Sequence, residues 1–259
     1  MNNGICLNAM IPFRAAPSHK SEMTDQLLFG EIFSILEDHN DWHFIRRWPD
    51  GYEGWIQEVQ PNRISEEQVD QIKRSGSHTV CEPFTSLSMG DSEIRIPGGS
   101  ILPLYDSSAR GFELNGRTYR LRGKTPAVPS NPRERIDHMA RLYLNAPYLW
   151  GGKTPFGIDC SGFIQVVFRA CGIQLPRDSH QQLKEGSSLG FVKDAQPADL
   201  AFFDNDQGEI IHAGIMLGPD QIIHASGRVK INPIDHQGIY NRELKKYTHK
   251  LRVVRKIID

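Results

Sequence analysis

The spacing of hydrophobic residues changes near residue 128, and this change limits the folds that the chain can adopt. Before it, short apolar runs alternate with turn residues, as in DWHFIRRW, PDGYEG and WIQEV. Short strands separated by Gly, Asn and Asp are typical of small β-barrels. After it, hydrophobic residues recur at helical spacing in RERIDHMARLYLNAP and CSGFIQVVFRACG, a shorter helix candidate stands at DSHQQLKEG, and strand-like runs follow. Helices followed by an antiparallel sheet indicate an α+β domain.

Local signals divide the chain further. The polar segment ISEEQVDQIKRS suits a helix, and Ser65 and Gln68 have the spacing of a capping box. The pair Asn115-Gly116 predicts a β-hairpin. The segment TPAVPSNP is rich in Pro and Ser, which is typical of a linker. The predicted segments are a first β-domain over 1–62, a connector helix over 63–75, a second β-domain over 76–128 and an α+β domain over 129–259.

The charge and hydropathy of the chain argue against some classes of partner. The formal net charge of −1 provides no strongly basic surface for nucleic acid or for an anionic membrane. The N-terminus has no basic segment followed by a continuous apolar one, and no stretch approaches the length of a bilayer span. We therefore expect a cytoplasmic protein without a membrane span. We also expect a monomer. A leader that had been removed would instead imply a periplasmic or secreted protein.

The stretch YLWGGKTPFGIDCSGFIQ places Cys160 where a helical pattern begins. A helix start lowers the pKa of a thiol, so this position favours the thiolate. Asp159 can cap the helix, but a neighbouring carboxylate raises a thiol pKa unless its charge is engaged. Taken alone, a cysteine at a helix start is more often a small buried residue than a nucleophile.

Two downstream histidines could supply the base that a cysteine nucleophile needs. His212 and His224 lie in EIIHAGIMLGPDQIIHAS, which has the pattern of a hairpin. If Gly218 is the centre of this hairpin, the histidines lie directly opposite each other on one face of the sheet. One could then accept the thiol proton while the other orients it. The alternatives are two structural histidines, or a metal site that includes Cys160. The chain lacks the HxE and PCxxC motifs of the catalytic zinc deaminases.

Five motifs, in order, resemble the NlpC family of papain-like cysteine peptidases, which cleave bacterial cell-wall peptides. Within residues 133–259 they are YLWGGKTPFGIDCSGF, LPRDSHQQ, QPADLAFF, IIHAGIMLG and IIHAS. The resemblance implies a papain-like α+β fold with Cys160 as nucleophile, His212 as general base and His224 as the residue that orients the base. It implies no metal and no other cofactor. Tyr148 would stand near the nucleophile, and the backbone amide of Cys160 could bind the oxyanion.

The first half of the chain resembles the bacterial SH3-like domains that precede one branch of this family, the γ-D-glutamyl-L-diamino-acid endopeptidases. The resemblance therefore implies two small all-β SH3-like barrels before the peptidase domain. Members of this branch release L-Ala-γ-D-Glu from murein peptides whose L-Ala amino group is free, which implies a murein peptide as partner. An unpaired ammonium group is costly to desolvate, and Asp159 can supply a carboxylate for it.

The other residues that the resemblance places at the substrate are Ser161, Ser179, His180, Glu31 and Tyr52. Glu31 and Tyr52 stand nearest to a glutamate and a tyrosine with which the first SH3-like domain of these relatives closes the cleft beyond L-Ala. The alternative is that Tyr52 fills the core and Glu31 is a solvated strand residue. The implied function is hydrolysis of the bond between γ-D-Glu and meso-diaminopimelate or L-Lys. An inert wall-binding protein and an acyltransferase on the same scaffold are the alternatives.

Overall fold

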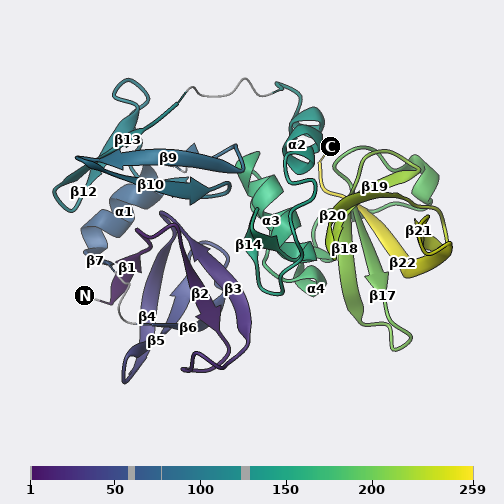
Figure 1. The fold of residues 1–259 in the computed structure, drawn as a ribbon, viewed down its shortest axis with the longest axis horizontal. Coiled ribbons are helices and arrows are strands. Elements are labelled where there is room, and N and C mark those ends of the chain that lie inside the picture. Colours follow the sequence, from purple (N-terminus) through teal and green to yellow (C-terminus); the bar gives the residue numbers. More distant parts are fainter. Residues whose placement is uncertain (1, 58–61, 77, 124–128, 259) are drawn as a thin grey trace. The chain divides into compact units, whose positions relative to one another are not determined.

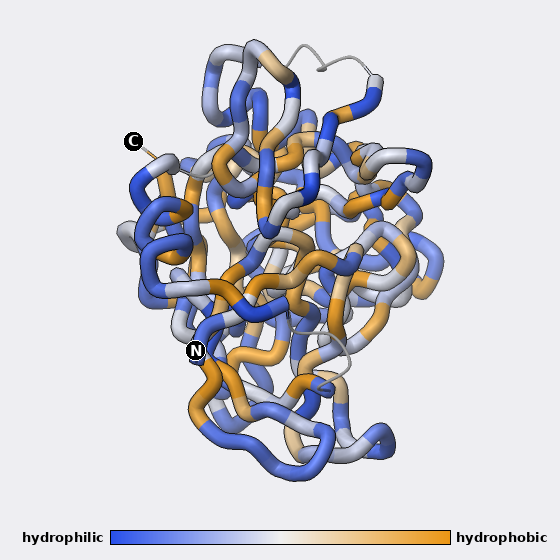
Figure 2. Tube along the Cα trace, turned by 90° about the vertical axis from the view of Figure 1, so that its left-hand side faces the viewer, coloured by the Kyte–Doolittle hydropathy of each residue, from blue (hydrophilic) through white to orange (hydrophobic). Residues whose placement is uncertain are grey.

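The computed structural model describes residues 2–57, 62–76, 78–123 and 129–258, and it divides into two compact units, Met1–Pro126 and Ala127–Asp259 (Figure 1). Residues 125–128 of the predicted linker TPAVPSNP lie outside the described residues. Hydrophobic and hydrophilic stretches alternate along the trace, and hydrophilic residues predominate in its outer loops (Figure 2). No helix among the described residues is both long enough and apolar enough to cross a membrane.

The first unit begins with a sheet of short strands. Seven of the described strands pair antiparallel in the order β3-β2-β6-β5-β4-β1-β7. Their bounds are β1 Asn3–Ile5, β2 Met10–Arg14, β3 Met23–Leu28, β4 Ile32–His39, β5 Trp42–Arg47, β6 Glu53–Gln57 and β7 Asn62–Ile64. The turn between β3 and β4 requires glycine, because Gly30 has φ +80° and a Cβ there would lie 1.8 Å from the carbonyl oxygen of Ile101.

One helix and a second group of strands complete this unit. The helix α1 (Glu66–Arg74) starts with the predicted capping box, which the hydrogen bonds between Ser65 and Gln68 confirm. The strands that follow are β8 His78–Thr79, β9 Phe84–Met89, β10 Ser92–Pro97, β11 Ile101–Leu102, β12 Gly111–Leu114 and β13 Arg117–Leu121. The predicted hairpin at Asn115-Gly116 is confirmed, since both residues have positive φ between the paired strands β12 and β13.

One of two hydrophobic core clusters in this unit crosses the predicted segment boundaries. One cluster joins Phe29 from the first β-segment, Val69 from α1 and Leu87 from the second β-segment. A second cluster lies within the first sheet around Phe13. Since the two β-segments share a core cluster, the domain boundaries at 62, 75 and 128 stay predictions.

The second unit has its helices before its sheet, as predicted. The helices are α2 Pro132–Arg141, α3 Cys160–Ala170 and α4 Ser179–Gln182, with the 3-10 turn η1 Val192–Asp194. Two short strands form one hairpin, β14 Lys153–Thr154 with β15 Gly157–Ile158. Six strands follow one another in the sheet as β16-β22-β17-β18-β19-β20, and β21 also pairs with β22. Their bounds are β16 Ser187–Ser188, β17 Leu200–Asp204, β18 Ile210–Met216, β19 Gln221–Ser226, β20 Arg228–Pro233, β21 Gly238–Asn241 and β22 Lys246–Lys256.

Two helices are shorter than the hydrophobic pattern predicted. The helix expected over RERIDHMARLYLNAP ends at Arg141, because the chain turns after it and Asn145 takes a positive φ before Pro147. The helix expected over DSHQQLKEG is the single turn of α4. By contrast, α3 is buried along all eleven of its residues, and these include the polar residues Gln165 and Arg169.

Candidate active site

Cys160 is the first residue of α3, and its fractional exposure is 7%. Asp159 caps the helix, because its side chain accepts a hydrogen bond of 2.7 Å from the amide of Gly162. A Cβ at Gly162 would lie 2.5 Å from the carbonyl oxygen of Gly152. The glycines around Cys160 therefore let the preceding loop lie directly against the start of the helix.

The carboxylate of Asp159 is paired with a buried arginine that the sequence analysis did not single out. Arg177 donates from Nη2 to Oδ2 at 2.6 Å and from Nη1 to Oδ1 at 3.2 Å. It also donates to the hydroxyl of Ser161 at 2.8 Å, and the amide of Gly151 donates to Asp159 Oδ2 at 2.9 Å. Arg177 thus balances the charge of Asp159. An incoming substrate amine would meet an ion pair at this point, not an isolated carboxylate.

The surroundings hold Cys160 as a thiol in the free protein. Burial, followed by the charge of Asp159, raises the pKa of Cys160 to about 11. The backbone of Ala213, the backbone of Ser161 and the charge of Arg177 act in the opposite direction. The expectation that the helix start favours a thiolate is therefore wrong for the free protein, because burial and the charge of Asp159 outweigh the contributions that lower the pKa of Cys160. Attack by Cys160 then needs a neighbouring proton acceptor.

A chain of hydrogen bonds runs through the two predicted histidines to an asparagine. His212 Nε2 lies 2.8 Å from His224 Nδ1, and His224 Nε2 lies 3.0 Å from Asn232 Oδ1. Since a carboxamide oxygen only accepts, Nε2 of His224 carries the proton and Nδ1 of the neutral ring is bare. That bare nitrogen accepts from Nε2–H of His212, which leaves Nδ1 of His212 as a proton acceptor. The residue after His212, Ala213, is the one whose backbone contacts the Cys160 thiol.

The predicted register of the histidine hairpin is wrong by two residues. Ile215 pairs with Ile223, so the hairpin is centred on Pro219 and not on Gly218. The two histidines are therefore diagonal neighbours. A shift of two residues keeps both side chains on the same face of the sheet, so the contact between them survives. Gly214 makes room for it, since a Cβ there would approach the Cβ of His224 to 2.9 Å.

Both histidines are neutral near pH 7. Burial lowers the pKa of His224 to about 4, and the charges of His249 and Lys230 act in the same direction. Burial, followed by the charges of His224, His249 and Lys230, lowers the pKa of His212 well below its usual range. A neutral His212 can accept the thiol proton, as the base of a cysteine nucleophile must.

The other predicted residues of this unit differ in their burial. Tyr148 is half-buried, and burial, followed by the charges of Cys160 and Asp159, raises its pKa to about 12. Its phenol is therefore a protonated donor near the thiol. Ser179 is half-buried at the start of α4, and His180 is exposed. Their contact with substrate stays a prediction.

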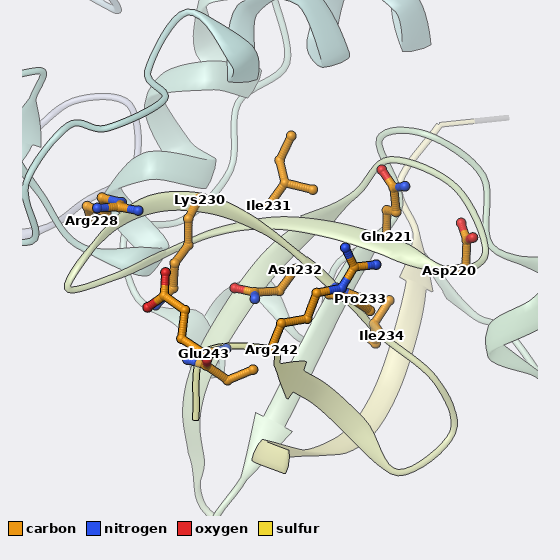
Figure 3. A pocket seen from close by; sticks show the side chains of 11 residues that line it. Asp220, Gln221, Arg228, Lys230, Ile231, Asn232, Pro233, Ile234, Arg242 and Glu243 are labelled. Carbon is orange, nitrogen blue, oxygen red and sulfur yellow. Dashed lines mark hydrogen bonds between the residues drawn. The ribbon is translucent and has the colours of Figure 1, made fainter. Parts of the chain in front are cut away.

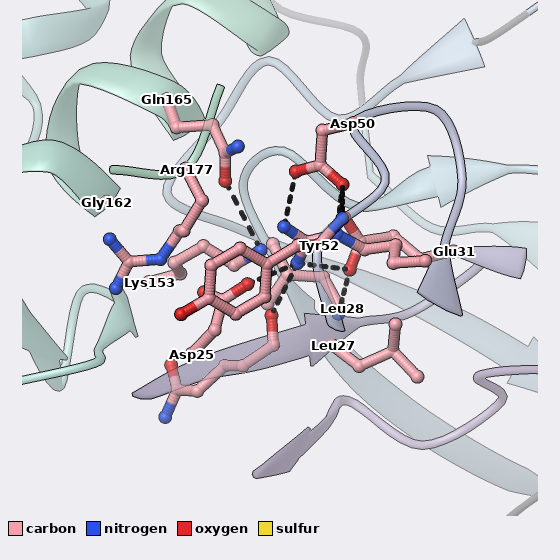
Figure 4. A network of polar contacts seen from close by, with 12 residues as sticks. Asp25, Leu27, Leu28, Glu31, Asp50, Tyr52, Lys153, Gly162, Gln165 and Arg177 are labelled. Carbon is pink, nitrogen blue, oxygen red and sulfur yellow. Dashed lines mark hydrogen bonds and ion pairs between the residues drawn. The ribbon is translucent and has the colours of Figure 1, made fainter. Parts of the chain in front are cut away.

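Glu31 and Tyr52 belong to the first unit, where both lie against Arg47. Glu31 is fully buried with its carboxylate 3.6 Å from Arg47, so the alternative of a solvated strand residue is wrong. Asp25 and Asp50 also pair with this arginine, each at 2.5 Å (Figure 4). Tyr52 is half-buried, and the guanidinium lies 5.5 Å from the centre of its ring. The role of Glu31 and Tyr52 towards substrate stays a prediction.

A cavity of about 410 Å³ lies beside the chain of hydrogen bonds. Lys230 and Asn232 of β20 line it together with Arg242 and Glu243, which follow β21 (Figure 3). Asn232 thus contributes both to the wall of the cavity and to the orientation of His224. Within the described ranges, no three His, Cys, Asp or Glu side chains are arranged to hold a metal ion.

Comparisons with known proteins match both units. The model of the NlpC/P60 family matches residues 145–249, and the model of the bacterial dipeptidyl-peptidase SH3 domain matches residues 13–60. The chain is 30% identical to a gamma-D-glutamyl-L-lysine dipeptidyl-peptidase of Bacillus subtilis, over 77% of this chain and 71% of the relative. It is 26% identical to dipeptidyl-peptidase 6 of Lysinibacillus sphaericus, over 93% of this chain and 96% of the relative.

Solved structures share the fold. A structure of an NlpC/P60 family protein from Bacillus cereus matches with a TM-score of 0.80 and 20% identity, over 99% of this chain and 100% of that one. An NlpC/P60 endopeptidase from Photobacterium damselae matches with a TM-score of 0.70 and 19% identity, over 97% of this chain and 70% of that one. The predicted fold class, an α+β papain-like domain after SH3-like β-modules, is confirmed.

Proposed function

Because the chain belongs to the NlpC/P60 family of cysteine peptidases, we propose that it hydrolyses the bond between γ-D-Glu and the diamino acid of murein peptides whose N-terminal L-Ala is free. The observation that carries the proposal is the placement of Cys160 at the start of α3, with its thiol against the backbone residue that follows His212. The name of the B. subtilis relative supports the choice of the γ-D-glutamyl bond. The second matched model, of a dipeptidyl-peptidase SH3 domain, supports release of a dipeptide.

The proposed reaction begins with transfer of the thiol proton. Nδ1 of His212 takes the proton of Cys160 as the sulfur attacks the γ-carbonyl carbon of D-Glu. The new imidazolium is stabilised through His224, whose own proton is held by Asn232. Negative charge that develops on the carbonyl oxygen meets the backbone amide of Cys160 at the positive end of α3. Tyr148 is a second donor near this point.

The same groups complete the cycle. His212 returns its proton to the amine of the departing diamino acid, which leaves L-Ala-γ-D-Glu bound to the sulfur as a thioester. His212 then takes a proton from water, the hydroxide attacks the thioester, and Cys160 leaves as thiolate and regains the proton. The dipeptide is released with a new carboxylate on D-Glu.

The amine of L-Ala is proposed to bind near Asp159 and Arg177. Since Arg177 already neutralises Asp159, the ammonium would share the carboxylate with the guanidinium, and Ser161 and Ser179 would complete its surroundings.

Two substrates test this proposal. The purified protein is incubated with L-Ala-γ-D-Glu-diaminopimelate and with its N-acetyl derivative, and the products are identified by mass spectrometry. The expected result is release of L-Ala-γ-D-Glu from the free peptide only, with no release by Cys160→Ala. Equal rates on both peptides would refute the proposed recognition of the amine, and release by Cys160→Ala would refute the mechanism. The same assay with L-Lys in place of diaminopimelate compares the two diamino acids.

A further inference from the structure

A third histidine, outside the hydrogen-bonded chain, lies against the candidate base. His249 in β22 stacks on His212 with ring centroids 4.2 Å apart and an interplanar angle of 29°. It also meets the ring of His224 edge-on at 5.7 Å. The ring of Phe203 in β17 contacts both histidines, with its centroid 5.7 Å from that of His212 and 5.9 Å from that of His249. One face of the His212 imidazole is thus covered by a second imidazole.

Irregular strand pairing around His249 helps to turn its side chain toward His212. The pairing of β22 with β17 shifts between Phe202 and Phe203, and its pairing with β21 shifts between Ile239 and Tyr240. Such bulges turn side chains away from the regular alternation of a strand. Thr248 Oγ1 lies 2.9 Å from Nδ1 of His249, which fixes the ring further.

A glycine in the neighbouring strand lets β22 take this path. Gly238 has φ +137°, and a Cβ there would lie only 1.8 Å from the carbonyl oxygen of His249. A residue with a side chain would push β21 away from β22 at this point. The stacked position of His249 is therefore supported from two sides, by the bulges of its own strand and by the close approach of β21.

We propose that His249 is a positioning residue for the general base: its neutral ring holds the plane of His212, and its protonation opposes formation of the His212 imidazolium. The inference rests on the proposed role of His212. A neutral ring stacked on an imidazolium is attractive, as in cation–π contacts, whereas two stacked cations repel. The same residue therefore supports the proton transfer at neutral pH and suppresses it in acid.

Three basic groups from neighbouring strands face His249. They are His212 from β18, His224 from β19 and Lys230 from β20. Among the described residues, no carboxylate lies within ion-pair distance of His249. Burial, followed by the charge of Lys230, lowers the pKa of His249, but burial lowers that of His212 further. A proton taken up by His249 in acid therefore opposes a second proton on His212, on which it stacks.

Two substitutions separate the ring from its charge. His249→Ala removes the stacking surface, and His249→Phe keeps an aromatic surface that cannot be protonated. We expect His249→Ala to lower kcat roughly tenfold with KM changed less than twofold, and His249→Phe to recover most of kcat. In the pH profile of kcat/KM, the acid limb of His249→Phe should move to lower pH than that of the unchanged protein. His236→Ala, at an exposed histidine, is the matched control and should leave both readouts unchanged.

The outcomes distinguish this inference from the proposed function. If the unchanged protein releases no dipeptide, the proposed function fails, and if His212→Ala remains active, the role of His212 fails. If the proposed function and the role of His212 both hold, a kcat of His249→Ala within twofold of that of the unchanged protein overturns the inference. Equal losses in the Ala and Phe variants, or an acid limb that stays in place in His249→Phe, overturn it as well. The rate of Cys160 alkylation by iodoacetamide against pH provides a readout without substrate, in which His249→Phe should extend reactivity to lower pH.

Discussion

The buried ion pair between Asp159 and Arg177 leads to a prediction that links stability to the reactivity of the thiol. The two substitutions are Asp159→Asn and Arg177→Met. Asparagine can still cap α3, and methionine replaces the guanidinium with an uncharged side chain of similar length. Each single variant removes one of the two opposite charges of the pair and leaves the other charge buried. The double variant Asp159→Asn/Arg177→Met removes both charges.

The size of the effect follows from the burial of the pair. The two side chains have fractional exposures of 6% and 2%, and their closest atoms are 2.6 Å apart. Breaking such a buried pair from one side costs roughly 3 to 5 kcal/mol. The double variant should lose less than the sum of the two single losses, by about 2 kcal/mol or more. The exposed pair of Asp137 and Arg141 in α2 is the matched control, and its coupling should stay below about 1 kcal/mol.

Urea unfolding at pH 7 measures the free energies of unfolding of the unchanged protein, the two single variants and the double variant. The rate of alkylation of Cys160 measures the effect of the pair on the reactivity of the thiol. Asp159 raises the pKa of Cys160 and Arg177 lowers it, so Asp159→Asn should speed alkylation at fixed pH and Arg177→Met should slow it. Strict additivity of the two losses would refute the claim that the pair compensates a buried charge. Faster alkylation in Arg177→Met would refute the assigned electrostatics.

Three further predictions concern the histidines. Burial lowers the pKa of His224 from 6.5 to about 4, so the neutral ring contributes fully to the free energy of unfolding above pH 6.5. This contribution should fall by about 3 kcal/mol as the pH drops to 4. Urea unfolding at pH 7 and pH 4 measures the loss, which His224→Gln should lack. The charge of Lys230 lowers the pKa of His212, His224 and His249. Lys230→Gln should therefore move the acid limb of the pH profile of kcat/KM a few tenths of a pH unit higher. An acid limb that stays in place, or an equal shift in the control Arg228→Gln, would contradict this. Asn232→Leu removes the acceptor that fixes the proton on His224 and should lower kcat roughly tenfold in the peptide assay, whereas full activity would show that the tautomers are set elsewhere.

Local signals in the sequence predicted those features that depend on neighbouring residues. The capping box at Ser65, the hairpin at Asn115-Gly116 and the helix start at Cys160 each depend on a few consecutive residues. The shared face of His212 and His224 was also predictable. Side chains alternate between the two faces of a sheet, so a register error of two residues leaves both histidines on the same face. Sequence position therefore located Cys160, His212 and His224 of the candidate site.

The features that were missed depend on contacts between distant segments. Arg177 stood in the quoted motif LPRDSHQQ, but its burial against Asp159 follows from the packing of the α4 segment on α3. Asn232 and His249 reach the histidine pair from β20 and β22, and strand order cannot be read from hydrophobic spacing. The pKa of Cys160 was misjudged for the same reason, since the helix dipole is a local property and burial is not.

The account depends most on Cys160 acting as the nucleophile with His212 as its base. The most direct measurement is intact-protein and peptide mass spectrometry after a rapid acid quench of the protein with L-Ala-γ-D-Glu-diaminopimelate. We predict a mass increase equal to one L-Ala-γ-D-Glu acyl group on the peptide that contains Cys160, its loss in Cys160→Ala, and slow formation in His212→Ala. Turnover of the peptide without an acyl group on Cys160, or by the Cys160→Ala protein, would contradict the account.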